Sequence, residues 1–93
     1  MMINSEKVIN VIETLFPELS KRECEFLFLY SMPSNHSLLE KQMKVSVNTV
    51  KTFHERVKVK LNIDNSLEMR LLLKTRLDFF FISQALSHFK GDR

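Results

Sequence analysis

The middle of the chain reads Ser46-Val47-Asn48-Thr49-Val50-Lys51-Thr52-Phe53-His54-Glu55-Arg56-Val57-Lys58-Val59-Lys60, a stretch that mixes apolar and polar residues at helical spacing. Val50 and Val57 fall on one side of a helix, together with Leu61 just beyond the stretch, and Phe53 lies at the edge of that side. The opposite side carries Asn48, Lys51, Thr52, Glu55 and Val59. The pattern predicts an amphipathic helix that packs through its valines and turns its polar groups outward.

Positive charge gathers around this stretch. Between Lys41 and Lys60 there are six basic residues and one acidic residue, so that segment carries +5 while the rest of the chain sums to −2. Charge concentrated on one element is typical of a protein that binds a polyanion such as nucleic acid. A solvated helix face would show a similar run of charge, so charge alone leaves this alternative open.

The composition predicts an all-α fold of five helices. The 93 residues include one glycine, two prolines and no Asn-Gly or Asp-Gly pair, whereas the hairpins of a sheet protein need such turns. Apolar periodicity and breaking residues place the helices at 5–16, 20–32, from between 34 and 37 to 43, 46–61, and 65 to about 88, with Gly91 just past the end. We expect one domain over 1–93: an N-terminal packing helix (1–17), a central unit (19–73) and a C-terminal extension (74–93).

Capping residues predict where the helices begin. Serine or asparagine followed three residues later by glutamate forms a reciprocal cap, because each side chain accepts from the other residue's amide. This pattern occurs at Ser20–Glu23, Ser37–Glu40 and Asn65–Glu68. Asn35 is an alternative cap for the third helix, and Ser46 is expected to cap the fourth.

Three blocks of the sequence stand in a fixed register: residues 19–27 (LSKRECEFL), 45–52 (VSVNTVKT) and 57–63 (VKVKLNI), followed by Glu68. Together they resemble the LuxR/GerE-type helix-turn-helix family, whose blocks read L-[ST]-x-R-E-x-E-[VI]-L, [IV]-S-x-x-T-V-K-[TN] and [IVL]-x-x-K-L-x-[VI]. The resemblance covers Leu19 to Leu73. It implies a bacterial transcription regulator in which Val47–Leu61 is the recognition helix and two copies pair through the helix after Asn65. It further implies DNA contacts from Thr49, Lys51, Thr52 and Glu55.

The chain departs from the family pattern at four positions. Pro33 and Lys44 stand where the family has glycines, Glu40 replaces a small alanine, and Phe53 replaces a histidine. Lys44 is expected to take a left-handed conformation or to reshape the turn. Glu40 is expected to crowd the crossing of the two motif helices or to bury a charge, unless the third helix is shifted or the motif has lost its DNA-binding role.

The predicted DNA contacts come from the start and the outer side of the helix 47–61. Asn48 can bond adenine bidentately, and Lys51 and Arg56 can bind guanine or phosphate. The hydroxyls and the unpaired amides of the first turn suit phosphate. Glu55 either accepts from a cytosine amino group or holds Lys51 or Lys58 in place. The full predicted set is Ser46, Val47, Asn48, Thr49, Lys51, Thr52, Glu55, Arg56 and Lys58.

The C-terminal helix is apolar on nearly every side. A domain of this size cannot cover both 71–73 (LLL) and 79–82 (FFFI), and an uncovered apolar surface marks an interface. We therefore expect a homodimer, which would place two recognition helices on two half-sites. The residues expected in its interface are Leu73, Leu77, Phe80 and Phe81. The alternative is a core helix of a five-helix bundle.

The sequence contains no pattern that predicts catalysis, a cofactor or a metal site. His36, His54 and His88 are scattered, Cys24 is a single cysteine, and P-loop, HExxH and CxxC patterns are absent. No apolar run is long enough for a membrane span, and the first residues lack the layout of a secretion signal. We expect a cytoplasmic, nucleoid-associated protein whose partners are double-stranded DNA, a second copy, and another regulator or RNA polymerase. The competing hypothesis is a protein–protein interaction module, a co-regulator or anti-activator, that keeps the fold without binding DNA.

Overall fold

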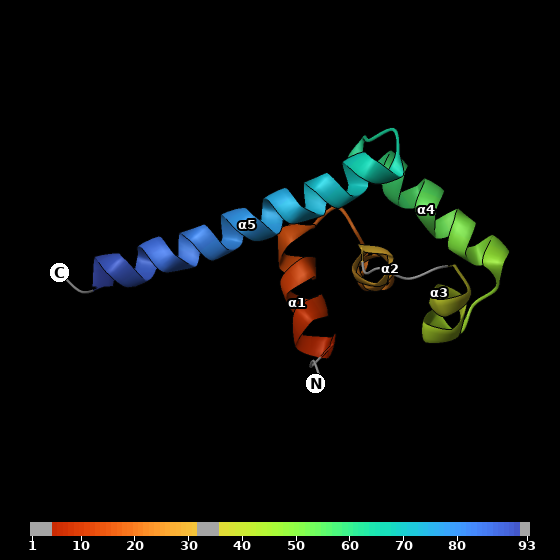
Figure 1. The fold of residues 1–93 in the computed structure, drawn as a ribbon, viewed down its shortest axis with the longest axis horizontal. Coiled ribbons are helices and arrows are strands. Elements are labelled where there is room, and N and C mark those ends of the chain that lie inside the picture. The colour runs from red at the N-terminus through yellow and green to blue at the C-terminus, as the bar shows by residue number, and fades with distance from the viewer. Residues whose placement is uncertain (1–4, 32–35, 92–93) are drawn as a thin grey trace.

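The protein is all-helical. The computed structural model describes residues 5–31 and 36–91, and within them the chain forms five helices and no strand: α1 Ser5–Leu15, α2 Lys21–Ser31, α3 His36–Met43, α4 Val47–Leu61 and α5 Ser66–Gly91 (Figure 1). The expected bounds hold within one or two residues except at the C-terminus, where α5 includes Gly91 instead of ending before it. The expected helix end at Met32-Pro33 and the alternative cap at Asn35 lie outside the described residues.

Side-chain caps set the starts of three helices. At α2 the Ser20 amide donates to Glu23 Oε1 (2.7 Å) and the Glu23 amide donates to Ser20 Oγ (3.2 Å), which confirms the predicted reciprocal cap. Ser46 caps α4, since its Oγ accepts from the Thr49 amide at 3.2 Å. Asn65 caps α5 through its side-chain oxygen. Each start is therefore fixed by residues that are close together in sequence.

Left-handed residues end the two helices that flank the turn. Lys44 follows α3 with φ 59°, which is the first of the two expected alternatives, and the next amide donates to the Glu40 carbonyl at 3.1 Å. Asn62 follows α4 with φ 55°, and the next amide donates to the Lys58 carbonyl at 3.0 Å. These six-to-one bonds are Schellman ends, which satisfy carbonyls that a helix terminus leaves unpaired. Ser37 lies inside α3 rather than at its cap, and Glu40 is only half-buried, so the expected burial of its charge does not occur.

The core lies where α1, α2, α3 and α4 meet the first turns of α5. Its largest fully buried side chains include Phe16, Phe26, Leu27, Val57 and Met69. Leu73 is 4% exposed and belongs to the same core. Its expected place in a dimer interface is therefore wrong, because its own chain already covers it.

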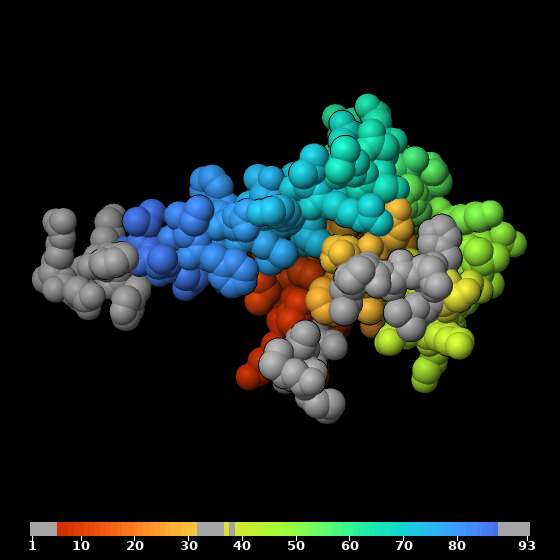
Figure 2. Space-filling model, viewed as in Figure 1, coloured from red at the N-terminus to blue at the C-terminus, as the bar shows by residue number. Residues whose placement is uncertain are grey.

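The second half of α5 projects beyond this core. The described fold measures 53 × 32 × 21 Å, and Figures 1 and 2 show the second half of α5 standing clear of the other helices along the long axis. The alternative of a core helix therefore holds only for the first half of α5. Although α5 is long, none of the described helices combines the length and hydropathy that a membrane crossing requires.

Arg76 ties α5 to the connection between α1 and α2. Its guanidinium donates two bonds to the Glu18 carboxylate (2.9 Å each) and one to the Leu15 carbonyl at the end of α1 (2.8 Å). The same group lies over the Phe16 ring, 4.4 Å from its centroid. One side chain thus supplies a bidentate ion pair, a helix C-cap and a cation–π contact. The bond from Arg76 is also the main cause that lowers the pKa of Glu18.

Replacing Arg76 should loosen the attachment of α5. We expect Arg76→Ala to lower the free energy of unfolding by about 1–3 kcal/mol, because a half-buried ion pair, a carbonyl bond and a ring contact are lost together. The matched control is Lys74→Ala on the same helix, which removes the exposed Lys74–Asp78 pair (2.7 Å) and should cost less than about 0.5 kcal/mol. Urea unfolding measures both, and equal losses would contradict the role given to Arg76.

Glycine at position 44 should stabilise the fold. A non-glycine residue in the left-handed conformation costs about 1–2 kcal/mol, and glycine removes this cost. Glycine also makes the unfolded chain more flexible, which offsets about half of the gain. Lys44→Gly should therefore raise the free energy of unfolding by about 0.5–1 kcal/mol. The control is Lys41→Gly inside α3, which should lower it by about 1 kcal/mol. A loss of stability in the Lys44→Gly variant would show that the lysine side chain contributes more than its backbone conformation costs.

Candidate nucleic-acid interface

One side of α4 is locked into the core and the other side faces solvent. The buried residues are Val50, Phe53 and Val57, which pack against α2 and α3. Phe53 is more enclosed than its edge position on the helix suggested, whereas Leu61 is only half-buried. The exposed polar side chains on the other side are Asn48, Lys51, Thr52 and Glu55. The predicted outward side of this helix is therefore present in the structure.

The hydroxyls at the start of α4 bond to their own helix. Thr49 Oγ1 lies 3.0 Å from Ser46 Oγ at the cap, and Thr52 Oγ1 donates to the Asn48 carbonyl at 3.0 Å. In this rotamer Thr52 can accept a bond from a base amino group, but it must rotate before it can donate to a phosphate oxygen. Both threonine hydroxyls are thus already engaged in hydrogen bonds within α4 and its cap.

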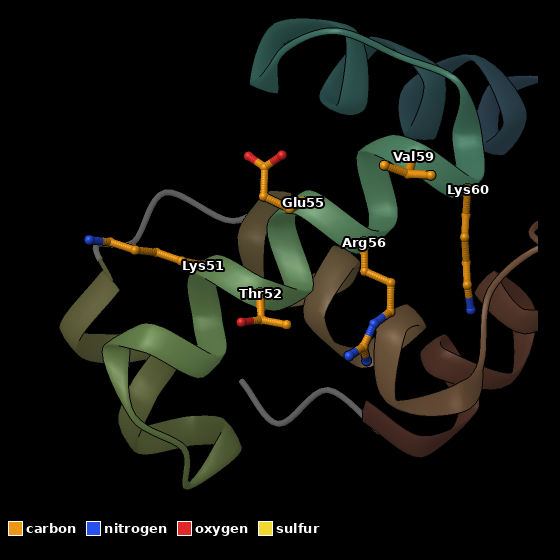
Figure 3. Close-up of a pocket in the computed structure, with 6 residues that line it drawn as sticks. All are labelled: Lys51, Thr52, Glu55, Arg56, Val59 and Lys60. Atoms are coloured by element: carbon orange, nitrogen blue, oxygen red, sulfur yellow. The ribbon is translucent and has the colours of Figure 1, made fainter.

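The cations of α4 differ in how freely they can reach a ligand. Lys51 extends into solvent (Figure 3), and no carboxylate among the described residues forms an ion pair with it. Lys58 pairs with Glu55 at 3.0 Å, and its side chain is only 20% exposed. This pair is one of the two roles predicted for Glu55. Lys51 is therefore the most accessible of the cations that the sequence assigned to DNA.

Arg56 turns back toward α2. Its Nε lies 3.8 Å from Glu23 Oε2, and its guanidinium lies over the Phe53 ring, 5.6 Å from the centroid. Figure 3 shows Arg56 and Lys60 directed to the same side of α4, away from Glu55. Arg56 stays a predicted DNA contact with a side chain that is 51% exposed and already has two partners within the protein.

Glu23 links the start of α2 to the end of α4. The residue is 1% exposed, and besides the Ser20 amide its carboxylate accepts from Lys60 Nζ at 2.7 Å. Burial acts to raise the pKa of this carboxyl, but the hydrogen bonds from Lys60 and Ser20 outweigh burial and hold the pKa below its usual value. A buried ionised carboxylate thus fixes the position of α4 across 37 residues of sequence.

Three further contacts that sequence reasoning missed join α2 to the end of α3, and both α2 and α4 to the start of α5. Arg22 donates to the Met43 carbonyl at the end of α3. Tyr30 donates from its hydroxyl to Ser66 Oγ at 2.6 Å, and His54 Nε2 lies 3.0 Å from the same oxygen. Arg22 and Glu23 both belong to the first block that resembles the LuxR/GerE-type family, and Glu23 was also predicted as half of the reciprocal cap with Ser20.

A shallow depression runs along the outer side of α4 (Figure 3). Its lining residues are Lys51, Thr52, Glu55, Arg56, Val59 and Lys60. Val59 is 78% exposed, which is unusual for an apolar residue on a polar helix face. The depression therefore offers three cations, a hydroxyl, a carboxylate and a methyl-bearing side chain within one strip.

The described part of the chain offers little for metal or thiol chemistry. No group of three or more His, Cys, Asp or Glu side chains in it is arranged to hold a metal ion. Burial raises the pKa of Cys24 to about 11, so this thiol stays protonated near neutral pH. The surface of α4 is thus the place where the predicted DNA-binding residues gather within the described ranges.

Comparison with known proteins adds no relative. No model of a known protein family matches the sequence, and searches of curated proteins and of solved structures give no match either.

Removing the charge of Glu23 should destabilise the fold in a pH-dependent way. At neutral pH we expect Glu23→Gln to lower the free energy of unfolding by about 1–3 kcal/mol, because Lys60 and Arg56 lose their counter-charge. A carboxyl with a lowered pKa stabilises the fold above its unfolded pKa of about 4.3 and ceases to do so as pH falls through the folded value. The difference between the two proteins should therefore narrow below about pH 5.

Urea unfolding at a series of pH values tests this expectation. Glu55→Gln is the matched control, because Glu55 pairs with a lysine of the same helix but has a side chain 68% exposed. That variant should change stability by less than about 0.5 kcal/mol. A gap between wild type and Glu23→Gln that stays constant down to acid pH would show that the ionised carboxylate does not contribute to stability.

Proposed function

We propose that this chain is a bacterial transcription regulator that binds double-stranded DNA as a homodimer, with α4 in the major groove. The observation that carries the proposal is the solvent-facing row Asn48, Lys51 and Thr52 on a helix whose opposite side is locked into the core. The 15 residues of α4 span about 22 Å, enough to lie across a groove about 12 Å wide. The LuxR/GerE-type blocks favour the same helix as the recognition element.

The contacts divide into base-reading and positioning groups. Asn48 and Lys51 carry the amide and ammonium groups that bond adenine and guanine edges. The capped start of α4 at Ser46 and Val47 directs the positive end of the helix dipole at a phosphate. Glu55 pairs with Lys58, which partly offsets its charge, and in this proposal its free oxygen accepts from a cytosine amino group. This division assigns sequence preference to the first half of the helix.

A homodimer fits this mode of binding, because two helices related by a two-fold axis read two half-sites. The exposed second half of α5, which includes Phe81 and the half-exposed Phe80, supports such pairing. Leu77 is half-buried against the core and lies at the border of that surface. In this proposal the regulator is cytoplasmic and nucleoid-associated, and it acts together with RNA polymerase or another regulator.

A protein–protein interaction module is the second candidate function. The observations that favour it are the exposure of Val59 on the outer side of α4 and the pairing of Arg56, Lys58 and Lys60 with carboxylates. Both features reduce the positive surface that a phosphate backbone would meet. The two candidates differ in one measurable property, which is the dependence of binding on salt.

Titration of duplex DNA of mixed sequence at several salt concentrations tests the proposal. The logarithm of the binding constant should fall with the logarithm of salt concentration, with a slope near −0.9 for each phosphate contacted. Lys51→Ala should weaken binding by about 1–3 kcal/mol, unevenly across duplex sequences, because it removes a base contact. Lys58→Ala should cost less, since Glu55 already holds that ammonium.

Lys74→Ala is the control, because Lys74 is an exposed lysine on α5 that lies outside the proposed interface. Its DNA affinity should match that of the wild type. Absence of DNA binding at low salt would favour the interaction module, and equal losses for Lys51→Ala on every duplex would remove the base-reading role of Lys51.

A further inference from the structure

We infer that two copies of the chain meet through a seam formed by Phe79, Ile82 and Leu86 on the projecting half of α5. These side chains are 72%, 58% and 60% exposed. The inference rests on the homodimer in the proposed function and assigns its interface to a different side of α5 from the one that includes Phe80 and Phe81.

The spacing of the seam residues is that of a coiled coil. Positions 75, 79, 82 and 86 follow one another at intervals of four, three and four, which is the alternation that keeps side chains on one seam between two helices. Thr75, the first of these positions, is exposed as well. From position 79 to position 86 the repeat passes through three of the four large exposed apolar side chains that are described in the projecting half, the fourth being Phe81.

The seam lies on the side of α5 opposite to the core. Met69 and Leu73 are buried on one side of the helix, and Leu77 continues that side toward the projecting half. At 3.6 residues per turn, Ile82 and Leu86 fall roughly half a turn away from this row, and Phe79 about a third of a turn away. The core of the same copy therefore cannot cover the seam without detaching α5.

An uncovered helix of this composition is unfavourable in water. Isolated helices shorter than about 12–15 residues are marginal, and most helical stability in proteins comes from packing an apolar side. Beyond Leu77 the described helices leave α5 without a neighbour over the seam (Figures 1 and 2). A partner that covers the seam would supply the missing packing.

Charge favours a second copy over a membrane surface as that partner. Between Leu77 and Ser87 the only charged residue is Asp78, which already pairs with Lys74 at 2.7 Å. Two identical surfaces with so little net charge meet without repulsion. A helix that lies on a membrane carries lysines and arginines along its polar side, and this segment has none.

The exposed area is sufficient for a reversible dimer. With about 150–250 Å² for a large side chain, the three seam residues offer about 350 Å² per copy. Two copies, together with the atoms that flank the seam, reach about 1,000 Å², which is the lower end for a specific interface. The dimer should therefore dissociate on dilution.

Sedimentation velocity of the full chain, without DNA, over a range of micromolar concentrations tests the seam. Ile82→Glu and Phe81→Glu form a matched pair, because they alter neighbouring residues of similar exposure (58% and 62%) that lie about a quarter turn apart. We expect wild type to dimerise, Ile82→Glu to raise the dissociation constant about tenfold or more, and Phe81→Glu to change it much less. Circular dichroism checks that both variants remain helical.

Three outcomes would overturn the inference. A wild type that stays monomeric would remove both the seam and the homodimer. Equal or stronger dissociation by Phe81→Glu would move the interface to the other side of α5 and leave the homodimer standing. Equal dissociation by Leu67→Glu, an exposed leucine (64%) at the opposite end of the same helix, would show a non-specific effect of charge. None of these outcomes depends on DNA binding, so failure of the seam and failure of the DNA proposal are distinguishable.

Discussion

The carboxylate of Glu23 connects the start of α2 to α4, and the orientation of the exposed side of α4 depends on this connection. It closes the cap of α2 through the Ser20 amide and reaches α4 through Lys60 and Arg56. A buried charge of this kind is tolerated only when its partners stay in place, because an unpaired carboxylate in the interior is costly. The angle of α4 is therefore set by an interaction on its inner side, and the position of its outer side follows from it.

The ends of α4 are constrained as firmly as its middle. A serine cap begins the helix and a left-handed Asn62 ends it, while a left-handed Lys44 and the Arg22 contact fix the helix before it. These contacts leave α4 little freedom to slide or rotate. They also engage basic groups: Lys60 and Arg56 pair with the buried Glu23, so two of the six basic residues that the sequence concentrates between Lys41 and Lys60 stabilise the fold. Lys51 stands apart because Glu55, the carboxylate one turn away on the same helix, pairs with Lys58 instead.

Local features of the fold could be predicted from the sequence, and long-range pairs could not. Caps such as Ser20 and Ser46 and the left-handed Lys44 depend on a few adjacent residues, so the sequence contains the whole cause. The pairs Lys60–Glu23 and Arg76–Glu18 join residues far apart in sequence, and no periodicity indicates them. The outer side of α4 was predictable because its apolar residues occupy one side. Which cations of α4 are free to bind a ligand was not predictable, because this depends on which side chains pair with carboxylates in the folded protein.

The last helix shows why periodicity fails when a helix is apolar all round. Leu73 and Phe79 look equivalent in sequence, yet the first is enclosed by the core and the second is 72% exposed. The difference arises where α5 leaves the other helices, just beyond the point at which Arg76 donates hydrogen bonds to Glu18 and to the Leu15 carbonyl. Before that point one side of α5 is buried in the core, and after it the opposite side is exposed to solvent. A single continuous helix can therefore attach to its own domain and offer a separate surface, and rigidity between the two parts follows from the unbroken backbone of α5.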